Sequence, residues 1–421
     1  MQRNWGFCRV FVIFIRKCTV FSVNRCFILR FFSVNRYLIH RKIIIFIAKS
    51  YYMYLHEREN WWQFTYDSSK VLKLLGRIRV KQGMVLGSLS TLGFEFQDEA
   101  MLSTMSVELV RSSEIEGEIL NLQEVRSSIA RRLGIETAGL VPASRYVEGI
   151  VEMLLDATQN YKKPLSDDRL FGWHNVLFPS GISGLYRIEV GKYRTGEMQV
   201  VSGAMGREKV HYQAPSPEKV PEEMKRFIQW VNTEEDIDEV IKAAIVHLWF
   251  VSIHPFDDGN GRITRALTDM MLARSENTGK RFYSMSAEIK LMQKEYYEIL
   301  ERTQKGDGDI TEWLLWFLKC LEKALDSTRD TLAAVLEKAK FWEYFRDIEF
   351  NVRQRKLINM LFDGFLGKLT SGKWAKIAKC SSDTALNDIN DLIAKGVLVK
   401  NNEGGRSTNY SLAKLHCIDE M

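Results

Sequence analysis

A histidine, an acidic residue, glycines and two arginines occur together in the segment His254–Arg265. An apolar run ends near Ser252, a loop with Gly259 and Gly261 follows, and apolar residues then recur at helical spacing. Glycines just before a helix let backbone N–H groups approach an anion closely, and the helix dipole favours that anion. The segment therefore predicts an anion-binding turn at the start of a helix.

The side chains around this turn suit the transfer of a phosphate-containing group. Arg262 and Arg265 are three residues apart, so both project from one side of the helix and suit a polyphosphate. Asp258 supplies the hard carboxylate oxygen that magnesium prefers, and His254 can act as a base near neutral pH. A buried histidine beside unrelated surface arginines is the alternative, but it leaves eight positions in register unexplained.

The segment also resembles the signature of the Fic family, His-x-Phe-x-Asp/Glu-Gly-Asn-Gly-Arg-x-x-Arg, which it matches without a departure. The resemblance covers about residues 145–320 and implies a protein adenylyltransferase that moves AMP from ATP onto a Ser, Thr or Tyr hydroxyl of a target protein. It implies that His254 is the general base, that Asp258 binds Mg²⁺ and that Phe256 points into the core. Phosphate binding is implied for Gly259, Asn260, Gly261, Arg262 and Arg265. The related Doc branch, which phosphorylates, has a different loop, so this loop favours AMP transfer.

Upstream, Ser112 and Glu116 lie four residues apart in a segment, 100–122, that we expect to be one helix. Such pairs commonly decorate solvated helix faces. Beside a Fic core, however, they resemble the inhibitory motif of the family, Ser/Thr-x-x-x-Glu-Gly/Asn, completed here by Gly117. The resemblance implies that Glu116 pairs with Arg265 in the space of the ATP γ-phosphate, and it predicts a repressed enzyme. In some relatives this glutamate helps to remove AMP, so a de-AMPylating hydrolase is an alternative.

Glycines punctuate short apolar runs between residues 188 and 217, a pattern typical of a β-hairpin. This hairpin resembles the Fic flap, which holds a target segment by strand-to-strand hydrogen bonds; a plain surface hairpin is the alternative. We expect target docking by Val200, Val201, Ser202, Gly203, Val210, His211 and Tyr212. His247, on the apolar helix before the motif, is expected to be a packed core histidine.

The elements that position these residues predict a mainly α protein. We expect a helical N-terminal domain at 53–140 that carries the inhibitory helix, then a Fic-type catalytic domain with the β-hairpin flap at 141–340. A winged helix-turn-helix domain is expected at 350–421. Helical spacing is found at 71–92, 148–157, 167–177, 218–232, 237–252, 263–274, 290–304, 310–340, 353–362, 373–380 and 382–394.

The C-terminal segment leaves its function open. Residues 350–421 contain 11 basic and 7 acidic residues, and the candidate recognition helix carries Asp383, Asp388 and Asp391, which are unfavourable beside phosphates. A nucleotide-responsive regulator that binds DNA through this domain is therefore an alternative. Because winged helices also act as dimer and docking modules, a homodimer or a protein contact is the preferred interpretation.

Charge is distributed unevenly along the 421 residues. Residues 1–52 contain ten Lys or Arg and no acidic residue, so the rest holds 49 basic and 53 acidic residues and gives no argument for nucleic-acid binding. Charges interrupt every apolar run of this leader, which speaks against a membrane span and a signal peptide. We expect Met53 to be the native start, and an amphipathic segment on a membrane surface is the alternative. The dispersed cysteines, Cys320, Cys380 and Cys417, fit a reduced cytoplasmic protein.

Overall fold

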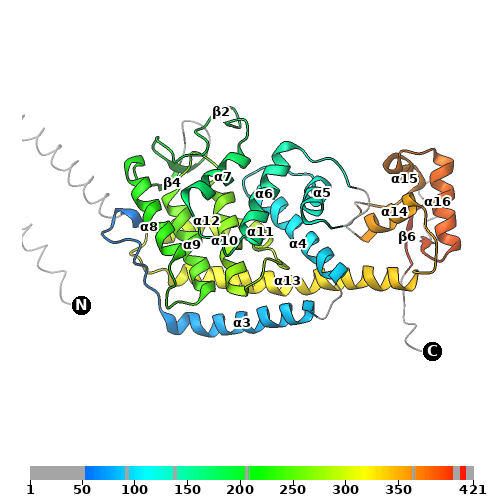
Figure 1. The fold of residues 1–421 in the computed structure, drawn as a ribbon, viewed down its shortest axis with the longest axis horizontal. Helices are drawn as coiled ribbons and strands as arrows, with labels where there is room; N and C mark the ends of the chain where they lie inside the picture. Colours follow the sequence, from blue (N-terminus) through cyan, green and yellow to red (C-terminus); the bar gives the residue numbers. More distant parts are fainter. Residues whose placement is uncertain are drawn as a thin grey trace, which may run out of the picture. The chain divides into compact units, whose positions relative to one another are not determined.

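The structure is a computed structural model that describes residues 53–90, 94–135, 140–203, 207, 209–362, 365, 367–401 and 408–413. The described residues from Tyr54 onward form one compact unit. The basic leader, residues 1–52, lies outside the described residues. Helices dominate the described part, which confirms the mainly α fold class (Figure 1). Within that part, no helix is long and apolar enough to cross a membrane.

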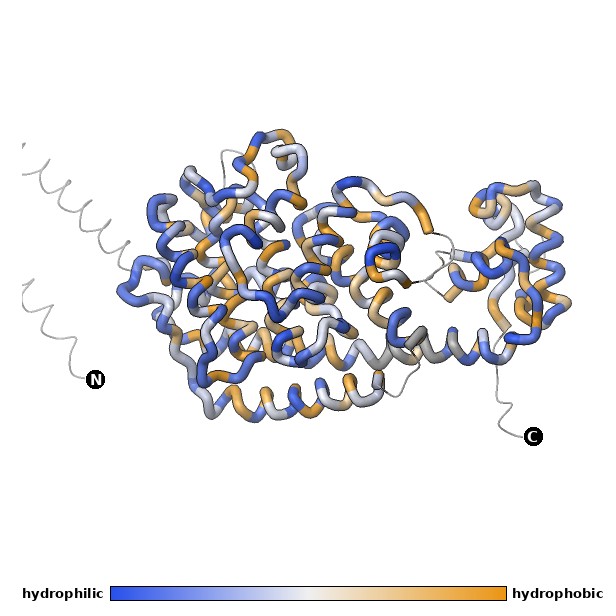
Figure 2. Tube along the Cα trace, in the orientation of Figure 1, coloured by the Kyte–Doolittle hydropathy of each residue, from blue (hydrophilic) through white to orange (hydrophobic). Residues whose placement is uncertain are grey.

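The N-terminal segment consists of the 3-10 helix η1 (Leu55–Glu57) and the helices α3 (Ser68–Ser90), α4 (Phe94–Ile115) and α5 (Leu122–Leu133). Helix α3 packs along α13 (Thr311–Tyr344) (Figure 1). Orange and blue alternate along α3 in Figure 2, as expected for a helix with one buried face. One hydrophobic core extends from Leu55 to Leu325, so the N-terminal and catalytic segments share it.

The catalytic segment is built around two adjacent helices, α9 (Glu239–Ile253) and α10 (Asn260–Glu276). Every residue from 240 to 253 is buried, which explains why this stretch is apolar on all sides. The neighbouring helices are α6 (Arg145–Gln159), α7 (Asp167–Leu177), α8 (Val220–Asn232), α11 (Met285–Leu291) and α12 (Gln293–Gln304). The helix predicted at 290–304 is confirmed as α12, but it begins only at Gln293, because the backbone leaves helical geometry at Met292 (φ −108°, ψ 28°).

Two short antiparallel hairpins lie in the segment between α7 and α8. The pair β3 (Gln199–Ser202) and β4 (Lys209–Gln213) confirms the predicted hairpin, with a register shift between Val200 and Val201. The pair β1 (Ile182–Ser183) and β2 (Tyr186–Arg187) was not predicted, because two-residue strands give no periodic pattern.

The C-terminal residues have a hydrophobic core of their own around Trp374, Ile389 and Leu392. It is formed by the end of α13, where Phe341 is buried, and by α14 (Val352–Phe362), α15 (Ser371–Ala378), α16 (Ser382–Ala394), β5 (Leu398–Lys400) and β6 (Tyr410–Leu412). These elements occur where the sequence predicts them, while the winged-helix assignment, DNA binding and dimer formation stay predictions. Asp388 is buried against Arg353, whose Nε donates to it at 2.7 Å, so α16 presents less acidic charge to solvent than its sequence suggests.

The helix with the predicted inhibitory motif ends earlier than expected. Helix α4 stops at Ile115, and Gly117 adopts φ +83°. The N–H of Glu118 donates to the carbonyl of Ser113, and the N–H of Gly117 donates to the carbonyl of Glu114. These two bonds form a Schellman cap, which needs a residue in the left-handed region at the glycine position. The single helix predicted at 100–122 is therefore wrong, and Glu116 lies in the capping turn.

Candidate active site

His254 lies at the C-cap of α9 and starts the loop that leads to α10. Its backbone is left-handed (φ 51°), so the chain turns away from α9 at this residue. Its Nδ1 lies 3.1 Å from the carbonyl oxygen of Val251, which can only accept a hydrogen bond. The proton of the neutral ring is therefore on Nδ1, and the lone pair of Nε2 is left for a substrate. Burial, assisted by the charge of Arg194, lowers the pKa of His254, so the ring is neutral at pH 7.

The loop after His254 is fixed to the core by two rings. Phe256 is fully buried and stacks on His174, with ring centroids 4.3 Å apart. His174 Nε2 donates to the carbonyl of Asp258, and its Nδ1 accepts from the N–H of Gly191. Burial lowers the pKa of His174 to about 4, which keeps this ring neutral and both bonds intact at physiological pH. The predicted inward orientation of Phe256 is confirmed.

Asn260 closes the loop from within. Its Oδ1 accepts from the N–H of Phe256 at 2.9 Å, and its Nδ2 donates to the carbonyl of Phe256 at 2.8 Å. The amide thus shapes the turn, and a direct contact of this side chain with phosphate stays a prediction. Gly259 adopts φ +80° at the N-cap, and α10 begins at the next residue. The first N–H groups of α10, including that of Gly261, have no partner within the helix and form an anion site.

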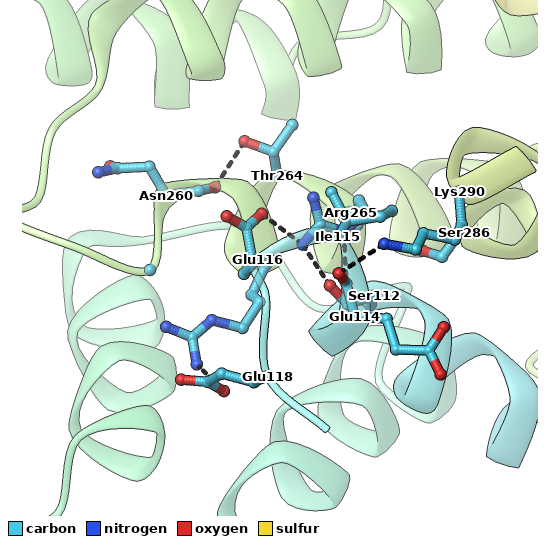
Figure 3. A network of polar contacts seen from close by, with 12 residues as sticks. Ser112, Glu114, Ile115, Glu116, Glu118, Asn260, Thr264, Arg265, Ser286 and Lys290 are labelled. Carbon is cyan, nitrogen blue, oxygen red and sulfur yellow. Dashed lines mark hydrogen bonds and ion pairs between the residues drawn. The ribbon is translucent and has the colours of Figure 1, made fainter. Parts of the chain in front are cut away.

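The turn after α4, which carries Glu116, meets α10 at Arg265 (Figure 3). Arg265 Nη2 donates to Glu116 Oε1 at 2.7 Å and to the carbonyl of Ser112 at 2.9 Å, and its Nε donates to Ser112 Oγ at 2.7 Å. Only 2% of the Arg265 side chain is exposed. Burial opposes its charge, but Glu116 outweighs this effect and raises the pKa of Arg265. The structure thus brings together the arginine and the glutamate that the sequence pairs across 149 residues.

The carboxylate of Glu116 also lies against the first turn of α10. A methyl group placed on Gly261 would come within 2.1 Å of Glu116 Oε1 and 3.2 Å of Arg265 Nη1. The carboxylate therefore occupies the space above the helix N-terminus, where exposed N–H groups favour an anion.

Asp258 is the candidate magnesium ligand. Its Oδ1 accepts from the N–H of Gly259, its Oδ2 accepts from the hydroxyl of Ser183, and 44% of its side chain is exposed. An accessible carboxylate next to a hydroxyl is a donor set that fits Mg²⁺. The described residues contain no group of three or more His, Cys, Asp or Glu that could hold a metal ion. Magnesium bound here would therefore take most of its ligands from phosphate and water.

Arg194 connects the β3–β4 hairpin to the loop of His254. Its Nε donates to the carbonyl of His254 at 2.8 Å, while its Nη1 and Nη2 donate to the carbonyls of Gly196 and Pro215 at the two ends of the hairpin. Arg194 is buried, and none of these partners is a carboxylate. Burying a guanidinium that only carbonyl groups bind costs free energy of folding. We therefore infer that Arg194 contributes by holding the hairpin and the loop of His254 in position.

The predicted flap residues divide into two groups. Val201 and Val210 are exposed on the hairpin, as a docking strand requires, and Val200, Ser202 and Gly203 belong to the same strand and its end. His211 Nδ1 lies 2.6 Å from Glu301 Oε2 on α12. Tyr212 is buried and donates to the carbonyl of Ser252, so its side chain anchors the hairpin and is not available to a target.

Two side chains that contact Arg262 were not predicted from the sequence. Arg262 Nη1 donates to Glu118 Oε2 at 3.0 Å and to the hydroxyl of Tyr146. No periodicity or spacing links Tyr146 on α6 to α10. Glu118 offered one signal, since it lies two residues after Glu116. The predicted core histidine, His247, is confirmed, for it is buried between Thr268 and Tyr296.

Comparisons with known proteins indicate a resemblance to one family. Residues 164–272 match the model of the Fic/DOC family, and residues 54–135 match the model of a domain of unknown function, DUF4172. Protein adenylyltransferase Fic of Drosophila grimshawi is 28% identical over 223 residues, which are 50% of this chain and 40% of the relative. That of Drosophila melanogaster is 27% identical, with 50% and 39% covered. The chain thus matches about two fifths of the length of these curated relatives.

Two solved structures are similar to this chain. A Fic family protein from Desulfovibrio desulfuricans G20 is 20% identical with a TM-score of 0.47, covering 81% of this chain and 96% of its own. Fic-1 from C. elegans is 24% identical with a TM-score of 0.43, covering 63% of this chain and 73% of its own. The family match includes α7, the β3–β4 hairpin and the whole loop of His254. Residues 164–272 of this protein therefore resemble a domain of the Fic/DOC family.

Proposed function

We propose that this protein is an auto-inhibited protein adenylyltransferase, which transfers AMP from ATP to a hydroxyl of a target protein. The observation that carries the proposal is the carboxylate of Glu116, bonded to Arg265 at the N-terminus of α10 beside the loop of His254. The curated relatives named protein adenylyltransferase support the reaction class.

The geometry supports an in-line transfer with His254 as the base. Nε2 of His254 takes the proton of the target hydroxyl, whose oxygen forms a bond to the α-phosphorus of ATP. The bond from this phosphorus to the oxygen that bridges to the β-phosphate breaks, and pyrophosphate leaves. The α10 N-terminus and the two arginines bind the developing negative charge. Magnesium held by Asp258 would neutralise phosphate charge during this step.

Glu116 would repress this reaction in two ways. Its carboxylate neutralises Arg265, and it fills part of the anion site above Gly261. A triphosphate would have to displace it, because two anions cannot share one buried guanidinium at low cost.

The test compares self-labelling from ATP that carries the label on the α-phosphate. We expect Glu116→Gly to label itself faster than the wild type, and the added change His254→Ala to abolish the label. Glu114→Gln is the matched control: Glu114 lies on the same turn, but its carboxylate bonds Arg111, away from α10. No gain for Glu116→Gly would refute repression by this residue. A label on both Glu116→Gly and the doubly changed protein would refute His254 as the base.

The same proteins separate addition of AMP from its removal. If the wild type releases AMP from a substrate modified beforehand, and Glu116→Gly does not, de-AMPylation is the principal activity. If neither protein releases AMP, the transferase assignment stands.

A further inference from the structure

Glu118 lies two residues beyond the inhibitory glutamate and contacts the other arginine of the site. Arg262 Nη1 donates to its Oε2 at 3.0 Å, and the Tyr146 hydroxyl donates to the same oxygen. The Arg262 side chain is 3% exposed and that of Glu118 is 41% exposed. A half-exposed carboxylate thus covers a buried guanidinium that lies one helical turn from Arg265.

The capping turn of α4 directs the carboxylates of Glu116 and Glu118 towards α10. Glu116 and Glu118 flank Gly117, whose left-handed backbone reverses the chain between them. The N–H groups of Glu116 and Glu118 both donate to the carbonyl of Ser113, so the residues on either side of the glycine are held by the end of α4. Two carboxylates at positions 116 and 118 therefore reach two arginines that are three residues apart on α10.

Side chains behind the turn hold it independently of the two arginines. Lys290 Nζ donates to the carbonyl of Glu114 at 2.8 Å, and Gln293 Nε2 donates to the carbonyl of Ile115 at 3.0 Å. These residues flank the break between α11 and α12. Because they bind backbone atoms of α4, removal of the Glu116 side chain leaves the turn in place, and Glu118 remains on Arg262.

We propose that Glu118 is a second inhibitory carboxylate, which occupies Arg262 as Glu116 occupies Arg265, so that one turn closes both arginines to the outer phosphates of a nucleoside triphosphate. The proposal rests on the proposed function, because it assigns a regulatory role within the same site. Glu116→Gly alone should then relieve repression only in part.

An anion with more charge than a carboxylate can displace Glu118 from Arg262. Burial raises the pKa of Glu118 despite the attraction of Arg262, and the charges of Asp258 and Glu116 add to this rise. Within the described residues, the Nε of Arg262 is buried without a hydrogen-bond partner. A phosphate group has more acceptor oxygens and more charge than one carboxylate, so it can satisfy this guanidinium better.

Calorimetric titration with AMP, ADP and ATP, each with magnesium, tests the proposal. Four proteins are compared: wild type, Glu116→Gly, Glu118→Gln and the double variant. We expect the double variant to bind ATP about fivefold more tightly than Glu116→Gly, a gain at the upper end for partly exposed ion pairs. AMP has no outer phosphate, so its affinity should change less than twofold. Self-labelling should rise in the same order as ATP affinity.

Glu118→Gln keeps the size of the side chain and can still accept from Tyr146, and thermal unfolding checks that the fold is retained. Tyr146→Phe removes the hydroxyl that bonds Glu118, so a smaller gain in ATP affinity is expected. Equal ATP affinity for Glu116→Gly and the double variant would overturn the proposal. An equal gain for AMP and ATP would also overturn it, because it would indicate a general loosening of the site.

The two proposals fail in different ways. If ATP affinity follows the expected order but no variant labels any protein, adenylyl transfer is refuted and the role of Glu118 stands. If Glu116→Gly labels itself and Glu118→Gln adds nothing to labelling or ATP affinity, the transferase stands and the role of Glu118 is refuted.

Discussion

Gly117 offers a way to test the proposed inhibitory role of Glu116 and Glu118 without altering either carboxylate. It adopts φ +83°, and a methyl group added to it would meet no atom within 4 Å. The change Gly117→Ala therefore causes no collision, and its cost is conformational. An L-residue in the left-handed region is less stable than glycine by roughly 1 to 2 kcal/mol. That strain falls on the turn that aims Glu116 and Glu118 at α10.

The inhibited state should lose about 1 kcal/mol relative to a state with the turn released, which corresponds to about fivefold in the population of the released state. We expect the initial rate of self-labelling from α-labelled ATP to rise by about that factor in Gly117→Ala. Global stability is a poorer measure of this effect, since Gly→Ala also restricts the unfolded chain and offsets part of the cost.

Gly117→Asn is the matched control, because asparagine adopts the left-handed conformation more readily than alanine. Its labelling rate should stay near that of the wild type. In the double variant without the carboxylates of Glu116 and Glu118, Gly117→Ala should have no further effect. A wild-type rate for Gly117→Ala, or an equal rise in that double variant, would refute the argument that the glycine acts through these carboxylates.

Three further predictions follow from contacts around the site. Glu108→Ala should lower the free energy of unfolding by about 2 to 4 kcal/mol in urea titrations, because this buried carboxylate accepts from the N–H and hydroxyl of Ser286 and ties α4 to α11. In the Glu116→Gly protein, Arg194→Lys should lower the transfer rate severalfold with the KM for ATP unchanged. A lysine cannot bridge the carbonyl of His254 and both ends of the hairpin. An unchanged transfer rate would contradict this prediction. Because the pKa of His254 is lowered, the base stays neutral down to pH 6.5, and transfer should decline only at lower pH; a decline that begins above pH 7 would exclude this residue as the group that titrates.

Much of the catalytic loop could be predicted because its contacts are local. The glycines, Asn260 and the start of α10 lie within a few residues, so the turn and its anion site follow from backbone geometry. The helices around α9 were also predictable, since each has an apolar face or is wholly buried. The break at Met292 and the early end of α4 were not, because apolar spacing continues through both positions.

The sequence by itself determined the residues that can do chemistry. Through its resemblance to a family motif it also predicted the pairing of Glu116 with Arg265. Only the tertiary structure decided that Glu118 and Tyr146 meet Arg262, and that Arg194 links the hairpin to the loop of His254. These contacts join residues 60 to 144 positions apart. They depend on how α4, α6 and α10 pack around one core, and no periodicity within a single element records that packing.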